Sequence, residues 1–489
     1  MSLSEKDLLA KVPTGLYIDG KWVSGHGAKP IRVEDPATGK TLIEIANANS
    51  DDALAALTAA DKAQEKWART PSRELAEILR RTFDLVKARS EEFAMLISLE
   101  MGKPLAEARG EVTYGNEFLR WFSEEAVRIT GRYNSNPEGT GKILIAKRPV
   151  GPAFAITPWN FPLAMATRKI GPALAAGCTI VVKPAELTPL TTLLLVKTFE
   201  EAGVPAGVIN VITTSTSSAT SGPLIADHRL RKITFTGSTT VGRKLIQQAS
   251  ERVLRTSMEL GGNAPFLVFE DADVDAAVAG AMLAKMRNIG QACTAANRFI
   301  VHESVAEEFG GKFAAKMGEL KLGRGVAEGT TCGPVINQAA QDNMERLVSA
   351  TVSEGGNVLV GGESLDGDGY FFKPTVLDNV SADSTIWKEE IFGPIAPIVR
   401  FKNEDDAVRL ANDTEYGLVS YAYTNDAKRQ LRLVETLDTG MTGINSGLVS
   451  NAAAPFGGTK ASGMGREGGA EGIDEYLEVK YAFIPDPFA

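Results

Sequence analysis

The sequence predicts an α/β fold with two large units and a small β element, and three observations support this prediction. Short apolar strands alternate with helices from residue 151 to residue 258, a rhythm typical of an open, mostly parallel, Rossmann-like sheet. The same alternation returns from residue 259 to about residue 470. A chain of 489 residues is also too long for one ordinary hydrophobic core. We therefore expect two α/β domains.

The N-terminal part of the chain is predicted to place a layer of helices over the first sheet. Segments 16–22 and 31–46 have the pattern of short strands separated by turns. Three helices follow, the first capped by Ser50 and the others opened by Pro71 and Ser90. A long helical layer has an apolar side to bury, and a sheet is its natural partner.

Strands and helices then alternate along the predicted sheets. The expected strands of the first sheet are residues 153–157, 179–184, 208–213 and 232–237, with helices between them. In the second unit a short apolar run over 266–269 is followed by a helix over 274–286. Further helices and a strand over 373–380 continue the pattern. No internal repeat or low-complexity linker interrupts it.

Two separate segments predict the small β element. Residues 142–150 alternate like a strand. The last segment places Leu477, Val479, Tyr481 and Phe483 on one face of another strand. A strand with such a face either stays at a sheet edge or pairs with another subunit.

Composition excludes several classes of function. The net charge of −9 is spread without a basic run, which argues against nucleic acid and anionic membranes as partners. Three cysteines without a CxxC pair indicate a reducing, cytoplasmic location. Three histidines without an HExxH-like cluster predict no metal site. We also expect no signal peptide and no membrane span, because no apolar run is long enough.

The stretch from Glu259 to Arg298 carries the strongest chemical pattern. Glu259 precedes the pair Gly261-Gly262, and Cys293 follows Gly290 and Gln291 at the other end. A thiol and a carboxylate that converge on one pocket form a nucleophile and a base for acyl chemistry. Taken singly, each has a simpler explanation. A lone cysteine is usually a small buried hydrophobe, and a Glu before Gly-Gly is usually a turn residue.

A second pattern lies at the strand-to-helix turn TFTGSTTVGRKL, residues 234–245. Gly237 and Gly242 are spaced nearly as in a P-loop, but Arg243-Lys244 replaces the required Lys-Ser/Thr. The turn does not match GxGxxG either. Spacing alone therefore gives only a weak indication of nucleotide binding.

Several motifs in a fixed order resemble the aldehyde dehydrogenase superfamily. They are PWNFP (158–162), FTGS (235–238), ELGG (259–262), GQAC (290–293), EEIFGP (389–394) and PFGGTKASGMGREGG (455–469). We interpret the last of these, which is rich in glycine, as structural. The resemblance covers residues 16 to 484. It implies that Cys293 is the nucleophile and Glu259 the general base. It also implies that the Asn160 side-chain amide and the Cys293 backbone N–H bind the oxyanion, although a loop amide more often satisfies nearby backbone.

The resemblance also implies a dinucleotide site. FTGS lies beside the pyrophosphate in this family, where a helix N-terminus offers free N–H groups. Lys183 corresponds to the lysine that binds the adenosine ribose, and Glu186 to the position that helps to select the cofactor. A carboxylate there favours NAD over NADP, whose 2′-phosphate it would repel. The implied cofactor residues are Thr157, Trp159, Lys183, Glu186, Gly237, Ser238, Glu390 and Phe392.

The substrate follows from a resemblance to the succinate-semialdehyde dehydrogenase branch. In that branch two arginines and a serine bind the distal carboxylate, and the matching residues are Arg168, Arg287 and Ser450. An intact Glu259 implies hydrolysis of a thioester to succinate, since relatives that transfer the acyl group to coenzyme A usually lack it. Glutarate semialdehyde, one methylene longer, stays open as an alternative. A catalytically idle binding protein on the same fold is the alternative from another class.

Domain boundaries and assembly complete the expectations. The NAD-binding domain is predicted over 1–126 and 150–258, and the catalytic domain over 259–470. Residues 127–149 and 471–489 are predicted to form an oligomerisation element of a homodimer or homotetramer. Some succinate-semialdehyde dehydrogenases pair the nucleophile with a cysteine two residues later, but that position here is Ala295.

Overall fold

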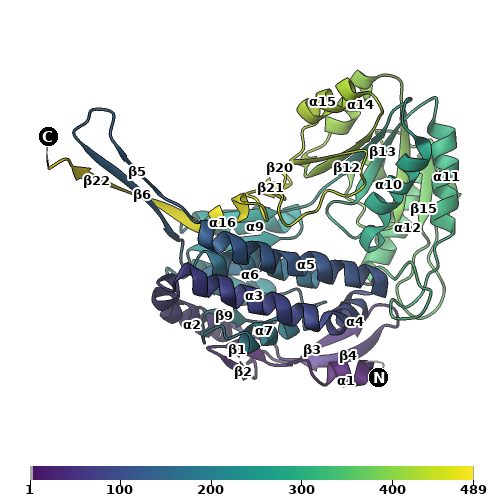
Figure 1. Ribbon diagram of the computed structural model, residues 1–489. Helices are drawn as coiled ribbons and strands as arrows, with labels where there is room; N and C mark the ends of the chain where they lie inside the picture. The colour runs from purple at the N-terminus through teal and green to yellow at the C-terminus, as the bar shows by residue number, and fades with distance from the viewer. Residues whose placement is uncertain (1–3, 488–489) are drawn as a thin grey trace.

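A computed structural model describes residues 4–487, and its architecture confirms the predicted α/β class. The chain forms two lobes and a projecting arm (Figure 1). The lower lobe in this view holds the first parallel sheet under a layer of helices, and the upper right lobe holds the second. Within residues 4–487 no helix has both the length and the apolar character needed to cross a membrane.

The first sheet has eight strands. Its five central strands, from β9 to β11, run parallel, and the outer strands β1, β2 and β21 are antiparallel to their neighbours. In spatial order the strands are β2 (Lys21–Val23), β1 (Leu16–Ile18), β9 (Ile209–Val211), β8 (Ile180–Lys183), β7 (Ala153–Ile156), β10 (Lys232–Thr236), β11 (Arg255–Glu259) and β21 (Gly463–Met464).

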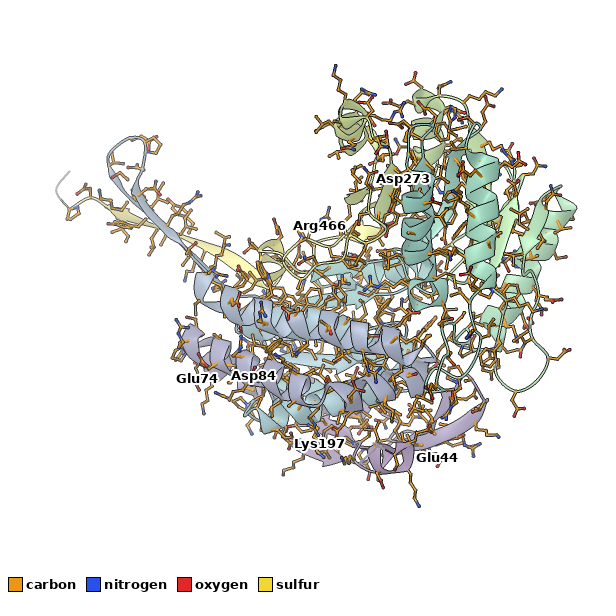
Figure 2. The ribbon with its side chains drawn as sticks, turned by 45° about the vertical axis from the view of Figure 1, so that its right-hand side comes forward. Glu44, Glu74, Asp84, Lys197, Asp273 and Arg466 are labelled. Carbon is orange, nitrogen blue, oxygen red and sulfur yellow. The ribbon has the colours of Figure 1, made fainter. Side chains whose placement is uncertain are left out.

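The helices of this lobe cover the first sheet. They are α1 (Glu5–Leu9), α2 (Ser50–Ala68), α3 (Ser72–Ala88), α4 (Ser90–Met101), α5 (Leu105–Glu125), η1 (Ala126–Arg128), α6 (Pro162–Ala175), α7 (Leu190–Glu201), α8 (Ser217–Ala226) and α9 (Thr239–Ser250). Helix α3 shows why. It buries Leu75 and Leu79 and exposes Glu74 and Asp84, which point outward in Figure 2.

The prediction that Ser50 caps the first of these helices is wrong by one residue. Asn49 is the cap, and its side-chain oxygen accepts hydrogen bonds from the N–H groups of Asp51 and Asp52. The Asp52 carboxylate accepts the Asn49 N–H in return, which completes a capping box.

The second sheet has seven strands, parallel except at β14. They are, in order, β14 (Asn357–Val360), β15 (Thr375–Asp378), β16 (Ile395–Phe401), β13 (Ala296–His302), β12 (Ala264–Val268), β18 (Val419–Tyr423) and β19 (Met441–Ile444). Its helices are α10 (Val274–Met286), η2 (Arg287–Gly290), α11 (Ala306–Gly318), α12 (Gln338–Ser353), α13 (Thr385–Lys388), α14 (Glu404–Asn412) and α15 (Ala427–Thr436). Buried aromatic and aliphatic side chains on both faces of the sheet form its cores.

The arm is a three-stranded antiparallel sheet that extends away from both lobes (Figure 1). It consists of β5 (Arg132–Ser135), β6 (Gly141–Pro149) and β22 (Leu477–Pro485), and β22 follows the short helix α16 (Glu471–Asp474). The terminal strand thus pairs with β6 of its own chain along its whole length. Tyr133, Val479, Tyr481 and Phe483 are exposed on the arm. Two further ribbons, β3 (Ile31–Asp35) with β4 (Lys40–Ile45) and β17 (Tyr416–Gly417) with β20 (Thr459–Lys460), complete the fold.

Strand direction brings the predicted site residues to one edge. Because β7, β8, β10 and β11 are parallel, their carboxyl ends lie together. The register pairs Ile156 with Lys183 and Thr236 with Glu259. Loops after these ends therefore face the second lobe.

Candidate active site

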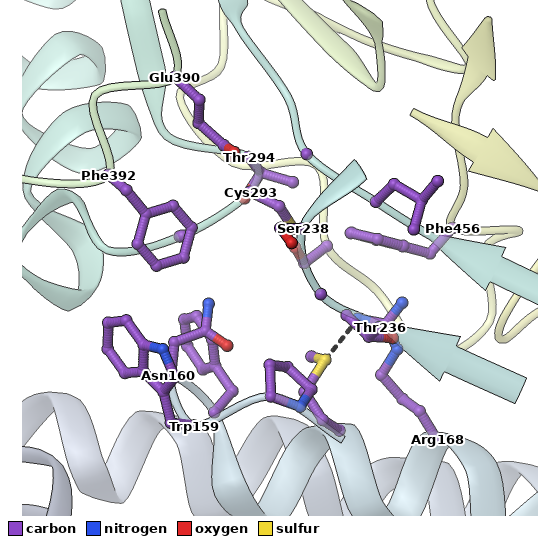
Figure 3. Close-up of a pocket in the computed structure, with 18 of the residues that line it drawn as sticks. Trp159, Asn160, Arg168, Thr236, Ser238, Cys293, Thr294, Glu390, Phe392 and Phe456 are labelled. Atoms are coloured by element: carbon purple, nitrogen blue, oxygen red, sulfur yellow. Dashed lines mark hydrogen bonds between the residues drawn. The ribbon is translucent and has the colours of Figure 1, made fainter. Parts of the chain in front are cut away.

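A cavity of about 230 Å³ lies where this edge meets the second lobe. Residues from both lobes line it, as Figure 3 shows. They are Tyr114, Pro158, Trp159, Asn160, Phe161, Met165, Arg168, Thr236, Gly237, Ser238, Leu260, Gly261, Arg287, Ala292, Cys293, Thr294, Glu390, Phe392, Ser450 and Phe456. A largely apolar cavity with a few convergent polar groups is the usual form of a small-molecule site.

A strained turn presents Cys293 to this cavity. Asn288 and Ile289 have φ values of 58° and 60°, and Gly290 follows at 72°. Such a conformation in β-branched Ile289 costs on the order of 1–3 kcal/mol. At Gly290 any side chain would also collide with the carbonyl oxygen of Gly393. The surrounding structure therefore imposes the turn that aims the thiol.

The Cys293 thiol is protonated at rest. Burial raises its pKa to about 12, with Arg168 lowering it and Glu259 and Glu390 raising it. The nucleophilic form of cysteine is the thiolate. The thiol proton must therefore leave before the sulfur can attack.

Glu259 has the chemistry of a base but lies behind the cavity wall. It ends β11 and is buried, while the next two residues, Leu260 and Gly261, line the cavity. Burial raises the pKa of the Glu259 carboxyl well above its usual value, and Glu467 raises it further. One of its oxygens has no hydrogen-bond partner within residues 4–487. A carboxylate in this setting is a strengthened base.

A buried charge cluster surrounds Glu259. Glu467 accepts a 2.5 Å hydrogen bond from Lys169 Nζ and forms a 2.7 Å ion pair with Arg168. Lys169 Nζ also donates to the hydroxyls of Thr234 and Thr236. Although burial opposes its charge, the two cations hold the pKa of Glu467 below its usual value.

Asn160 lines the cavity and contacts the loop that carries the nucleophile. Its side-chain Nδ2 donates a 3.0 Å hydrogen bond to the carbonyl oxygen of Gln291. An amide nitrogen carries two hydrogens, so one donor stays available for a bound oxyanion. The Cys293 backbone N–H faces its own thiol.

The eight expected cofactor residues separate into two groups. Trp159, Gly237, Ser238, Glu390 and Phe392 line the cavity. The rings of Trp159 and Phe392 meet edge-to-face at 5.5 Å, and Phe392 has a strained φ of 53°. Thr157, Lys183 and Glu186 do not line it but follow or end β7 and β8 at the same sheet edge.

Two cofactor residues have local partners. Ser238 caps helix α9, since its hydroxyl oxygen accepts the Val241 N–H at 3.4 Å. Glu390 accepts the Gly262 N–H at 3.0 Å, within the ELGG segment. Burial raises the pKa of Glu390 to about 7.

The three expected substrate residues all line the cavity. Arg287 Nη1 donates a 3.1 Å hydrogen bond to the Ser450 hydroxyl, and its guanidinium lies over the rings of Tyr114 and Phe161 at 5.3 and 5.2 Å. Arg168 stacks on Phe456 at 3.9 Å, and the dashed line in Figure 3 is its contact with the sulfur of Met165. The structure therefore brings the two arginines and the serine together.

Sequence reasoning missed several residues of this site. Tyr114 lines the cavity, and its hydroxyl is buried without a hydrogen-bond partner in the described part of the chain. Lys169 and Glu467 form the charge cluster beside Glu259. Glu467 stands in a segment that was expected to be structural, and Tyr114 lies in no motif. Lys169 directly follows Arg168 in the sequence, and this adjacency to a predicted substrate residue could have indicated that Lys169 lies near the site.

Comparison with known proteins identifies the family. The model of the aldehyde dehydrogenase family matches residues 22–482. This chain belongs to the aldehyde dehydrogenase family. A succinate-semialdehyde dehydrogenase of Paenarthrobacter nicotinovorans is 61% identical over 447 residues, 91% of this chain and 99% of the relative. A glutarate-semialdehyde dehydrogenase of Pseudomonas putida is 46% identical, over 96% of this chain and 97% of the relative.

Other members of the aldehyde dehydrogenase family show the same likeness. The Escherichia coli succinate-semialdehyde dehydrogenase [NADP(+)] is 45% identical, over 96% of this chain and 97% of the relative. A crystal structure of succinate-semialdehyde dehydrogenase from Burkholderia pseudomallei superimposes with a TM-score of 0.96 at 46% identity, covering 99% of this chain and 100% of that one. The predicted family and fold are thereby confirmed.

Proposed function

We propose that this aldehyde dehydrogenase oxidises succinate semialdehyde to succinate. One observation carries the proposal: Arg287 lines the same cavity as the Cys293 thiol, and within residues 4–487 its partners are a hydroxyl and two aromatic rings, with no carboxylate in an ion pair. A partly desolvated guanidinium of this kind suits an anionic group, and its planar fork matches a carboxylate.

The remaining donors converge on the same place. Arg168 Nε and the Tyr114 hydroxyl are buried without hydrogen-bond partners in the described residues. Ser450 already contacts Arg287. A carboxylate at one end of a short aldehyde satisfies these donors, while its carbonyl end lies towards Cys293.

In the first half-reaction Cys293 forms the bond to substrate. Its thiol first loses its proton to water, and the resulting thiolate is the nucleophile. The sulfur then bonds to the carbonyl carbon, and the electron pair of the C=O π bond moves to oxygen. Asn160 Nδ2 and the Cys293 N–H hold this oxyanion; one such donor contributes about 2.7–4 kcal/mol to lowering a barrier.

In the second half-reaction the acyl group leaves the enzyme. Loss of hydride leaves a thioester on Cys293. Glu259 takes a proton from water as its oxygen bonds to the acyl carbon. The C–S bond breaks and regenerates the Cys293 thiolate, and the acid product leaves as succinate after losing its proton to solvent.

A nicotinamide dinucleotide supplies the hydride acceptor, and the residues present fit one. The Thr157 hydroxyl is buried with no partner among the described residues. Helix α9 begins at Thr239, directly after the loop that lines the cavity, and offers N–H groups to phosphate. Lys183 makes one long contact, 3.3 Å to the Pro184 carbonyl, and burial lowers its pKa.

Within the NAD(P) class, NAD is the proposed preference. Glu186 is exposed in the turn after β8. There its carboxylate would accept hydrogen bonds from the adenosine ribose hydroxyls of NAD and would repel the 2′-phosphate of NADP. The Escherichia coli relative is named for NADP, so the preference is a property to measure in this chain. We expect kcat/KM to favour NAD by at least about tenfold, roughly 1.4 kcal/mol, and Glu186→Ser to narrow the gap. Steady-state kinetics with both cofactors measure this, and a wild type that favours NADP contradicts it.

The central test combines product and intermediate. Purified enzyme, succinate semialdehyde and NAD should give succinate, identified by mass spectrometry. Cys293→Ala should still bind dinucleotide but make no acid. Glu259→Ala should release one hydride per site and then stall as a thioester. Full turnover by either variant contradicts the assignment.

Glutarate semialdehyde is the second candidate, favoured by the Pseudomonas putida relative. One methylene changes selectivity by only about 1–3 kcal/mol, so a panel of ω-carboxy, neutral and cationic aldehydes ranked by kcat/KM decides between them. The same panel tests the idle-protein alternative, since such a protein turns over none of them.

We also propose domain boundaries, an oligomeric state and a cellular location for this chain. We assign 1–126 and 150–258 to the NAD-binding domain, 259–470 to the catalytic domain, and 127–149 with 471–489 to oligomerisation; residues 1–3 and 488–489 lie outside the described part. The exposed apolar face of the arm supports a homodimer or homotetramer. Three unpaired cysteines support a cytoplasmic location. Sedimentation of Tyr481→Lys against wild type tests the assembly.

A further inference from the structure

A buried polar network lies beneath the cavity and joins helix α5 to both reactive loops. Glu107 and Glu111 stand one helical turn apart on α5, and Lys103 lies just before it. Lys103 and Glu111 are buried, and Glu107 is half-buried. Neither the motifs nor the proposed reaction steps use this network.

Asn288 is the member that touches both loops. Its side-chain Nδ2 donates to the Asn160 carbonyl oxygen at 3.1 Å and to the Gln291 carbonyl oxygen at 2.8 Å. Its backbone N–H donates to Glu107 at 2.5 Å. It is fully buried, and its φ of 58° belongs to the strained turn before Cys293. One amide thus bridges the loop of the oxyanion donor and the loop of the nucleophile.

The other end of the network holds the Asn160 loop from below. Lys103 Nζ donates to the same Asn160 carbonyl oxygen at 2.9 Å and to Glu111 at 2.5 Å. Glu111 also accepts the Leu163 N–H at 2.9 Å, at the start of helix α6. The Asn160 backbone is therefore held by two donors from two different elements.

We propose that Asn288 is a positioning residue, whose bridging amide sets the Asn160 side chain at the correct distance from the Cys293 sulfur. The inference rests on the proposed function, because it assigns Asn160 and Cys293 their roles in acyl chemistry. Small displacements of an oxyanion donor are costly, since its hydrogen bonds depend on the position that the developing charge will occupy.

The test replaces Asn288 by glycine, which accepts the positive φ and removes only the side-chain donors. Asn379→Gly is the matched control. Asn379 also has a positive φ of 54° and donates through its side chain to a carbonyl, that of Gly355, but it is exposed and does not line the cavity. Both variants are measured for thermal unfolding, dinucleotide binding and the single-turnover rate of hydride release with succinate semialdehyde.

We expect Asn288→Gly to slow hydride release by 10- to 100-fold while dinucleotide affinity changes by less than threefold. Asn379→Gly should keep the wild-type rate. A rate of hydride release by Asn288→Gly within threefold of wild type overturns the inference. So does an Asn288→Gly variant whose dinucleotide affinity falls by the same factor as its rate of hydride release. A wild type with no hydride release overturns the proposed function first and this inference with it, so the two failures are distinguishable.

Discussion

The two arginines of the cavity differ in what surrounds them. Arg168 is paired with Glu467, belongs to a cluster with Lys169, and is almost completely buried. Arg287 sits between two aromatic rings and contacts a hydroxyl. The sequence indicates one role for both, whereas the structure separates them. A guanidinium with its own carboxylate supports the fold and the local charge, and a guanidinium without one has its charge available for a ligand.

The largest expected effect breaks the paired side of this comparison. Glu467→Ala leaves Arg168 and Lys169 buried without their carboxylate, so the free energy of unfolding should fall by about 3–5 kcal/mol. Arg287→Ala should lower the free energy of unfolding by less, about 1–2 kcal/mol, since it loses two cation–π contacts and one hydrogen bond to Ser450. Denaturant unfolding measures both. Equal losses would contradict the distinction.

The unpaired side should control selectivity. Arg287→Ala should reduce kcat/KM for succinate semialdehyde. The loss of transition-state stabilisation should be about 2–5 kcal/mol, the cost of removing one partner of a desolvated charge pair. Propanal, which has no carboxylate, should be affected far less. Arg168→Ala should impair both substrates as well as stability. If Arg287→Ala weakens both substrates equally, Arg287 is structural.

The pH dependence of Cys293 reactivity should also distinguish Arg168 from Arg287. Cys293 and Glu259 act in their deprotonated forms, and the pKa of each is raised mainly by burial. Activity should therefore rise with pH and be lost as pH falls. Because Arg168 lowers the pKa of the thiol, Arg168→Met should move the alkylation profile of Cys293 with iodoacetamide to higher pH. Arg287→Met should leave it in place, and an unchanged profile for Arg168→Met would be contrary evidence.

The smallest effect concerns the buried hydroxyl of Tyr114, which lines the cavity. Tyr114→Phe keeps the ring beneath Arg287 and removes only the unpaired O–H. We expect kcat/KM for succinate semialdehyde to fall by an amount that corresponds to roughly 0.5–1.5 kcal/mol, the contribution of one ordinary hydrogen bond. The kcat/KM for propanal should not change. Tyr133→Phe, on the exposed arm, is the control. A Tyr114→Phe enzyme with wild-type kinetics would show that this hydroxyl does not touch substrate.

Sequence patterns predicted what is local and failed where a partner is distant. The α/β alternation is contiguous in the chain, so the fold class could be predicted from it, and the contiguous motifs around Glu259 and Cys293 gave the candidate residues. The pairing of Arg168 with Glu467 joins segments far apart in the chain, and only packing reveals it. The same holds for the Asn288 bridge to Asn160. The Ser50 error has another cause, because two adjacent polar residues were both suitable caps and side-chain geometry selected Asn49.

The register of the arm has a consequence for biosynthesis. Strand β22 pairs with β6 from Leu477 opposite Pro149 to Pro485 opposite Gly141, so the hairpin gains its third strand only after residues 477–485 are made. At roughly 5–20 residues per second, a ribosome takes on the order of tens of seconds to cover that interval. Throughout it, the nascent chain carries a hairpin with one unpaired apolar edge, a feature that attracts chaperones and favours aggregation. Premature termination near the C-terminus should therefore harm solubility before it harms the chemistry.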